Sequence, residues 1–105
     1  MRTHADIDRR SLLLARAVAQ RIDDDASRQG LERARQVCAR WRAQSDSPAI
    51  QEWAAILAAP WEEVRPILLE ESERGQRLRQ SSPFCGVLTP RKRWQLYREF
   101  GDGTQ

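Results

Sequence analysis

Histidine and cysteine, the residues most often used in nucleophilic catalysis and metal binding, are nearly absent from this 105-residue sequence. The one histidine, His4, lies almost at the start of the chain, where it is poorly placed to act as the base that a serine or cysteine nucleophile needs. The two cysteines, Cys38 and Cys85, lack the spacing of zinc ligands, and Cys38 fits a small buried hydrophobe on an apolar helical stripe. We therefore predict that the protein is not an enzyme and holds no metal or cofactor.

Long apolar runs and glycine-rich loops are missing as well. No stretch approaches the roughly 18 apolar residues of a membrane span, and no apolar signal-peptide region follows the first residues. No glycine-rich phosphate loop is present, and the glutamate pairs at 62–63 and 70–71 fall on the solvent side of predicted helices. We expect a cytoplasmic protein with no membrane partner.

Apolar residues recur at helical intervals through most of the chain, which predicts an all-α fold. The expected helices cover about 6–24, 27–43, 48–59, 61–71 and 90–100. Ser47-Pro48 and Thr89-Pro90 each place proline at the first helical position after an N-cap residue, whereas Pro66 should kink or shorten its helix. We predict one domain over 1–105, a compact bundle of about five short helices with frayed ends at 1–5 and 101–105.

The first two helices, joined by a short acidic turn, are expected to form an antiparallel hairpin. After residue 73 the sequence changes abruptly from acidic to basic, and it either continues the fourth helix or begins another after Gly75. The segment 81–88 has no helical period and contains Pro83 and Gly86, so it predicts an ordered Ser/Pro/Gly loop before the last helix.

Tryptophan is plentiful for so short a chain, and its rings are the first candidates for the core. Each ring can bury a large apolar area, and burial stabilises the fold by about 25 cal/mol for every Å² removed from water. The four candidates are Trp41, Trp53, Trp61 and Trp94.

The net charge of +3 is unevenly distributed along the sequence. Residues 47–73 carry six acidic side chains and one basic, whereas residues 74–105 carry seven basic and two acidic. A helix-turn-helix over 52–69 is disfavoured as a DNA reader, because its glutamates would repel phosphates. The basic C-terminal part contains aromatic residues, a mixture that nucleic-acid binders use, but Trp94 and Tyr97 are spaced to face inward on a helix. The basic surface that remains could pair instead with the acidic middle of this chain, of a second copy or of a different protein.

The run LRQSSPFCGVLTP at 78–90, followed by Arg93-Trp94 and Arg98-Glu99-Phe100, resembles the end of a family of small uncharacterised bacterial proteins. Similar stretches at 7–12, at Trp53 with Ile56-Leu57 and at 61–64 extend this resemblance over most of the chain. Small helical proteins of this kind are often encoded beside toxin genes, so the resemblance implies an antitoxin-like role. It carries over no functional residues.

We therefore predict a non-enzymatic, antitoxin-like protein-interaction module that binds and neutralises a co-encoded toxin with an acidic face. The sequence leaves open whether the protein also forms a homodimer. The alternative is a small basic protein that binds nucleic acid weakly through the same arginine-rich C-terminal surface. The arginines at 79, 91 and 93 are expected to be exposed beside the loop. The apolar residues of this loop either hold it in place as part of the binding surface or only fill the end of the helical bundle. The predicted partner-binding residues are Arg79, Ser82, Phe84, Arg91 and Arg93.

Overall fold

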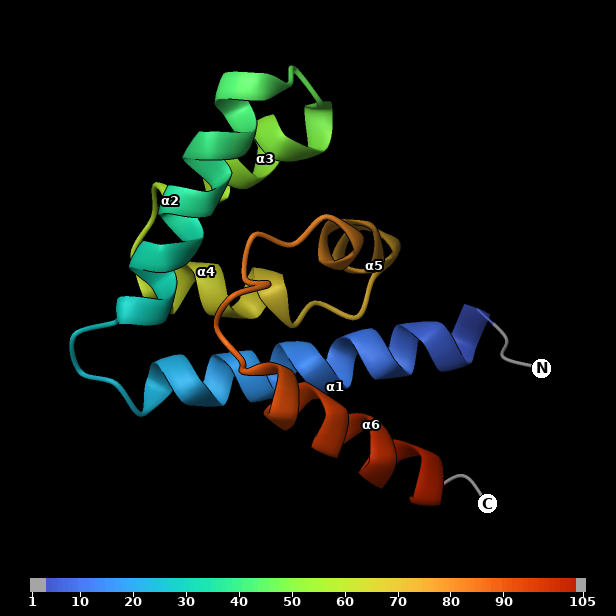
Figure 1. The fold of residues 1–105 in the computed structure, drawn as a ribbon. Helices are drawn as coiled ribbons and strands as arrows, with labels where there is room; N and C mark the ends of the chain where they lie inside the picture. Colours follow the sequence, from blue (N-terminus) through green and yellow to red (C-terminus); the bar gives the residue numbers. More distant parts are fainter. Residues whose placement is uncertain (1–3, 104–105) are drawn as a thin grey trace.

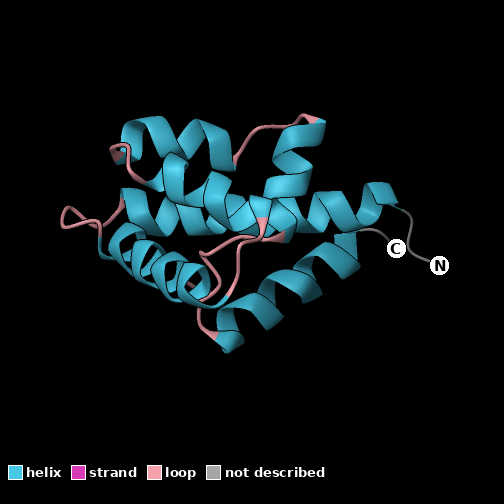
Figure 2. Cartoon of the chain, turned by 90° about the horizontal axis from the view of Figure 1, so that it is seen from above, coloured by secondary structure: helices cyan, strands magenta, loops and turns pink. Residues whose placement is uncertain are grey.

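The computed structural model describes residues 4–103, and the side chains of residues 8–99. The described residues form six α-helices and no strand (Figures 1 and 2). The helices are α1 (His4–Asp23), α2 (Gln29–Gln44), α3 (Pro48–Leu57), α4 (Trp61–Leu68), α5 (Glu73–Gln80) and α6 (Pro90–Gly103). The predicted all-α fold is confirmed, with six helices where about five were expected.

The additional helix is α5, which begins before Gly75 rather than after it. Ser72 is its N-cap, and the Ser72 hydroxyl accepts a hydrogen bond from the backbone N–H of Gly75 at 3.2 Å. At the start of α6, the Thr89 hydroxyl caps the helix in the same way, accepting from the N–H of Lys92 at 3.1 Å. These caps fix where the two C-terminal helices start.

Helix α1 is the element on which most of the others pack, because it contacts α2, α4, α5 and α6. Figure 1 shows α2 rising from the C-terminal end of α1 at a wide angle and packing along α3, while α6 crosses α1. The predicted antiparallel hairpin of the first two helices was therefore wrong. Arg28, the N-cap of α2, has a left-handed φ of 54°, and Gly30 lets α2 approach α1 because a Cβ there would lie 2.7 Å from Ile22 Cγ1.

Helix α4 is short, as Pro66 within it led us to expect. It ends at Leu68 instead of continuing to about residue 71, and Pro66, which has no N–H to donate to the carbonyl of residue 62, lies in its last turn. Trp61 Nε1 and Arg65 Nε both donate to the Asp23 carboxylate, at 2.7 and 2.9 Å. The bond from Trp61, followed by those from Arg65, holds the pKa of Asp23 below its ordinary value and fastens α4 to the end of α1.

The core centres on two of the four tryptophans. Trp53 is 1% exposed and donates from Nε1 to the Leu78 carbonyl at 2.9 Å, and Trp61 is also buried. The ring of Phe84 packs edge-on against Trp53, with centroids 5.8 Å apart, and tilted against Trp61 at 6.3 Å.

The other two tryptophans correct the prediction. Trp41 is only half-buried, near the end of α2 that projects away from α1 (Figure 1). Trp94 is 65% exposed. Helix α6 packs on α1 with Leu96 buried, which leaves the face that carries Trp94 uncovered.

We expect Trp53→Ala to lower the free energy of unfolding by about 3–5 kcal/mol, since it removes a fully buried ring and leaves the Leu78 carbonyl without its donor. Trp94→Ala should unfold at nearly the parent's denaturant concentration. Urea denaturation of both variants followed by circular dichroism measures this. Equal losses at the two positions would mean that α6 is packed differently.

Candidate functional site

The loop of residues 81–89 is fixed in place by buried side chains and by arginines from two helices. Phe84 and Leu88 are buried in the core, as expected for a loop whose apolar residues fill the end of the bundle. Arg33 on α2 donates to the Gly86 carbonyl at 3.0 Å, and Arg93 on α6 donates to the Cys85 carbonyl at 2.9 Å. The predicted ordered loop is thus held from both sides.

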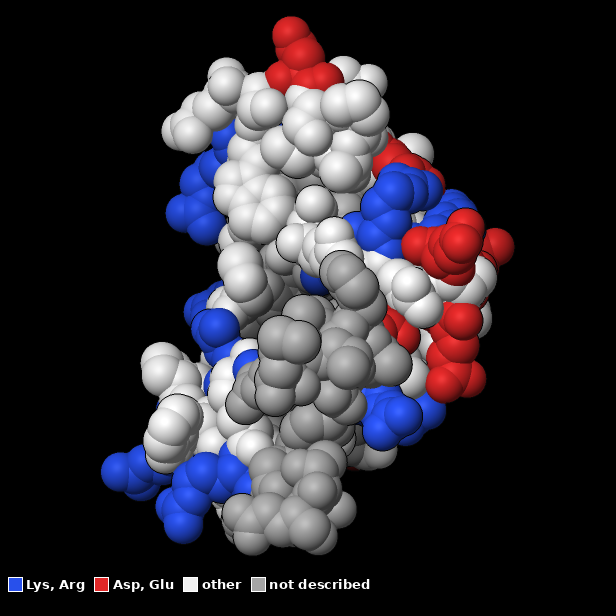
Figure 3. All heavy atoms as spheres, turned by 90° about the vertical axis from the view of Figure 1, so that its right-hand side faces the viewer, with Lys and Arg blue, Asp and Glu red and all other residues white. Residues whose placement is uncertain are grey.

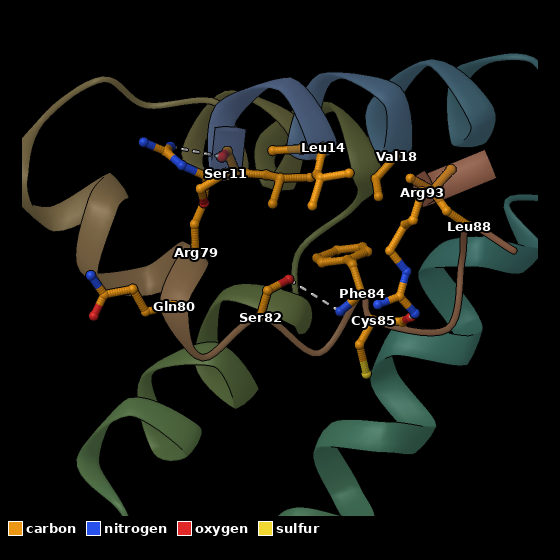
Figure 4. Close-up of a pocket in the computed structure, with 12 residues that line it drawn as sticks. Ser11, Leu14, Val18, Arg79, Gln80, Ser82, Phe84, Cys85, Leu88 and Arg93 are labelled. Atoms are coloured by element: carbon orange, nitrogen blue, oxygen red, sulfur yellow. Dashed lines mark hydrogen bonds between the residues drawn. The ribbon is translucent and has the colours of Figure 1, made fainter. Parts of the chain in front are cut away.

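A cavity of about 260 Å³ lies between α1, this loop and the start of α6 (Figure 4). We call it the α1–α6 cavity. Its apolar lining consists of Leu14, Ala15, Val18, Leu68, Phe84 and Leu88. Its polar lining consists of Ser11, Arg79, Gln80, Ser82, Cys85 and Arg93.

Four of the five predicted site residues, Arg79, Ser82, Phe84 and Arg93, meet at this cavity. The fifth, Arg91, is exposed on α6 and does not line it. The contributions of α1, above all Ser11 and Leu14, escaped the sequence analysis. In the sequence they fit an ordinary amphipathic helix, and nothing there indicates which loop packs across it.

Arg79 was expected to be exposed, and this was wrong: the residue is 7% exposed. One guanidinium nitrogen donates to the carbonyls of Leu68 and Glu70, at 3.2 and 2.6 Å, and the other terminal nitrogen pairs with the Asp8 carboxylate at 3.2 Å. The last carbonyls of a helix have no partner within the helix, and arginine can satisfy them. Arg79 therefore caps α4 and ties it to α1.

Gly75 makes this contact possible. A Cβ at this position would lie 1.9 Å from the Glu70 carbonyl oxygen and 3.1 Å from a terminal nitrogen of Arg79. Only a residue without a side chain lets α5 pass so close to the carbonyl that Arg79 binds. The sequence shows Gly75 as one isolated glycine and gives no sign of this role.

Three described arginine side chains, one each on α1, α5 and α6, keep a buried nitrogen without a hydrogen-bond partner. Among the described residues, the buried side-chain nitrogen and oxygen atoms without a hydrogen-bond partner are the Nε atoms of Arg10, Arg79 and Arg93. The guanidinium carbon of Arg10 lies 4.3 Å from the centroid of the Tyr97 ring, one helical turn beyond Arg93. Unlike Arg79, neither Arg10 nor Arg93 is ion-paired within the described part of the chain.

Beside the cavity, the exposed side of α6 carries a cluster of basic residues around a tryptophan. We call it the α6 outer face, and it comprises Arg91, Lys92, Trp94, Gln95 and Arg98. Within residues 8–99, the three basic side chains of this face make no hydrogen bond or ion pair. The face therefore presents unneutralised positive charge next to a large exposed ring.

Much of the remaining charge is paired internally. Arg77 binds Glu52 at 2.8 Å, and Arg74 binds the same carboxylate at 3.3 Å. These contacts, that of Arg77 above all, hold the pKa of Glu52 below its ordinary value. Figure 3 shows acidic side chains mixed with basic ones on one edge of the molecule and basic side chains along the opposite edge.

Neither a metal-binding cluster nor a membrane-spanning helix is present in the same described residues. No group of three histidine, cysteine or acidic side chains there is arranged to hold a metal ion, and none of the helices is both long and apolar enough to cross a membrane. Cys38 is buried, and this burial raises the pKa of its thiol. Comparison with protein-family models, with curated proteins and with solved structures found no match.

We expect Arg79→Met to lower the free energy of unfolding by about 3–5 kcal/mol, because it leaves two carbonyls and the Asp8 carboxylate without their donor. Arg77→Met is the matched control. It makes the same substitution two positions earlier in the chain, where the arginine belongs to an exposed ion pair with Glu52, and its melting temperature should stay close to the parent's. If both variants melt together, Arg79 is a surface residue.

Proposed function

We propose that the protein is a non-enzymatic protein-interaction module, acting in the cytoplasm, whose partner is another protein with an acidic face. The contact surface in this proposal is the α6 outer face. The resemblance to small helical proteins encoded beside toxin genes supports a more specific form, an antitoxin-like regulator that binds and neutralises a co-encoded toxin.

The observation that carries the proposal is the exposure of Trp94. Within the described side chains it is the one large hydrophobic residue left exposed, at 65%. Arg91 and Arg98 lie about one helical turn to either side of it, on the same side of α6. Tryptophan and arginine are the residues enriched at the energetic centres of protein interfaces, so their combination here favours a binding role.

Charge supports an acidic partner. Within the described side chains Arg91, Lys92 and Arg98 have no acidic partner, whereas Arg77 is paired with Glu52, and Arg74 with Glu52 and Glu70. A patch of unpaired positive charge attracts a negatively charged surface, which raises the association rate at low salt and sets the orientation of docking. The α6 outer face is therefore a better contact surface than the α5 arginines.

Site-specific crosslinking in the native host tests this surface. A photoreactive residue replacing Gln95 should crosslink a partner protein, whereas the same residue replacing exposed Gln36 on α2 should not. With that partner purified, Trp94→Ala should weaken binding at least about thirtyfold, corresponding to the ~2 kcal/mol that marks a hot spot. Gln36→Ala is the control, and a crosslink between two copies would identify a homodimer.

Crosslinking from position 36 alone, or parent-like affinity of Trp94→Ala with the melting temperature unchanged, would move the contact surface away from α6.

A second candidate is weak binding of single-stranded nucleic acid, because a tryptophan among basic side chains also serves as a stacking platform for bases. Only three unpaired cations belong to this face, so the affinity should be micromolar or weaker at physiological salt. Its logarithm should fall with the logarithm of salt concentration with a slope of about −2. Titration of randomised single strands and duplexes measures both, and a nanomolar preferred sequence would replace the protein partner by nucleic acid.

A further inference from the structure

The α1–α6 cavity combines an apolar interior with a cationic border. Figure 4 shows Leu14 and Val18 on α1 facing the ring of Phe84 on the loop, with Arg79 and Arg93 at opposite ends. Its volume of about 260 Å³ lies just below the 300–1,000 Å³ typical of drug-sized ligands. An occupant must therefore be small, with an apolar part no larger than a short chain or a single ring.

The two arginines that border the cavity each have one donor to spare. Arg79 is more than nine-tenths buried, and its Nε–H has no acceptor although both of its terminal nitrogens are engaged. Arg93 uses a terminal nitrogen on the Cys85 carbonyl, and its buried Nε–H also lacks an acceptor. A buried donor without a partner costs free energy that an oxygen atom of a ligand would recover.

The charge around the opening selects an anion. Asp8 neutralises Arg79, but Arg93 has no acidic partner in the described part of the chain, and neither has Arg10, which packs on Tyr97 nearby. A carboxylate oxygen makes a stronger hydrogen bond to a guanidinium N–H than a neutral oxygen does.

We infer that the α1–α6 cavity is a binding site for a small organic carboxylate, with the acid group on Arg93 and a short apolar tail that lies against Phe84 and Leu14 and points toward Arg79. This site does not depend on the proposed protein partner, since Trp94 and Arg91 lie outside its lining.

The test is a titration of the whole protein with 3-phenylpropionate, followed by the side-chain Nε–H signals of its arginines in ¹H–¹⁵N spectra. The signals of Arg79 and Arg93 should shift with a saturable dependence on concentration, while those of Arg91 and Arg98 stay in place. The matched alcohol, 3-phenylpropanol, should bind about tenfold more weakly, because it keeps the ring and loses the charge. This comparison needs no variant and so does not depend on any variant's folding.

Three variants sharpen the result. Arg93→Gln should weaken 3-phenylpropionate binding about tenfold, whereas Arg91→Gln, which removes one charge two residues away, should leave it unchanged. Ser11→Phe, placed at the border of the cavity, should abolish binding by filling it.

Three outcomes would overturn the inference: no saturable shift at Arg79 and Arg93, equal binding of acid and alcohol, or equal losses in the Arg93→Gln and Arg91→Gln variants. A fourth arm uses the acetylated and amidated dipeptide Phe-Glu. Saturation by this peptide alone would make the occupant a partner's side chain and would exclude a free carboxylate.

Discussion

The guanidinium group of Arg79 closes a junction that three helices share, and much of the C-terminal half depends on it. It donates to the carbonyls of Leu68 and Glu70 at the end of α4 and to Asp8 on α1, and the Arg79 side chain also lines the α1–α6 cavity. The chain must pass very close to the Glu70 carbonyl for this, which is why α5 has a glycine at position 75. Because both terminal nitrogens of this deeply buried charged group find acceptors only on α1 and at the end of α4, the positions of α4 and α5 are coupled through one side chain.

Arginine plays the same structural part at two other helix ends. Arg28 donates to the carbonyls of residues 22, 23 and 25 at the end of α1, and Arg35 donates to those of residues 57 and 59 at the end of α3. Basic side chains near a helix C-terminus also interact favourably with its dipole. A good part of the arginine content therefore serves the fold, and the surface available to a partner is smaller than the composition suggests.

The pattern of the sequence was enough for the helices and for part of the core. Helix α3 begins at Pro48 and α6 at Pro90, where proline follows an N-cap residue, and Trp53 and Trp61 are buried as their spacing indicates. Arg79 escaped because burial of an arginine depends on carbonyls that only the end of another helix supplies.

Trp94 escaped for the opposite reason. Its spacing with Tyr97 on α6 suits a buried stripe, but within the described residues α1 is the main helix against which α6 packs, and one neighbour covers one face. At the candidate site, the sequence pointed to the loop and its arginines, and four of the five residues do meet there. The wall from α1 could not be predicted, because it requires knowing that residues 11–18 and 79–88 pack together.

Hydrogen exchange of the arginine side chains tests the central junction most directly. If the guanidinium group of Arg79 is held between α4, α5 and α1, its Nε–H should exchange with solvent at least an order of magnitude more slowly than those of exposed Arg91 and Arg98. Equal exchange rates in the folded protein would contradict the account, because they would place the Arg79 side chain in water and leave the end of α4 without its cap.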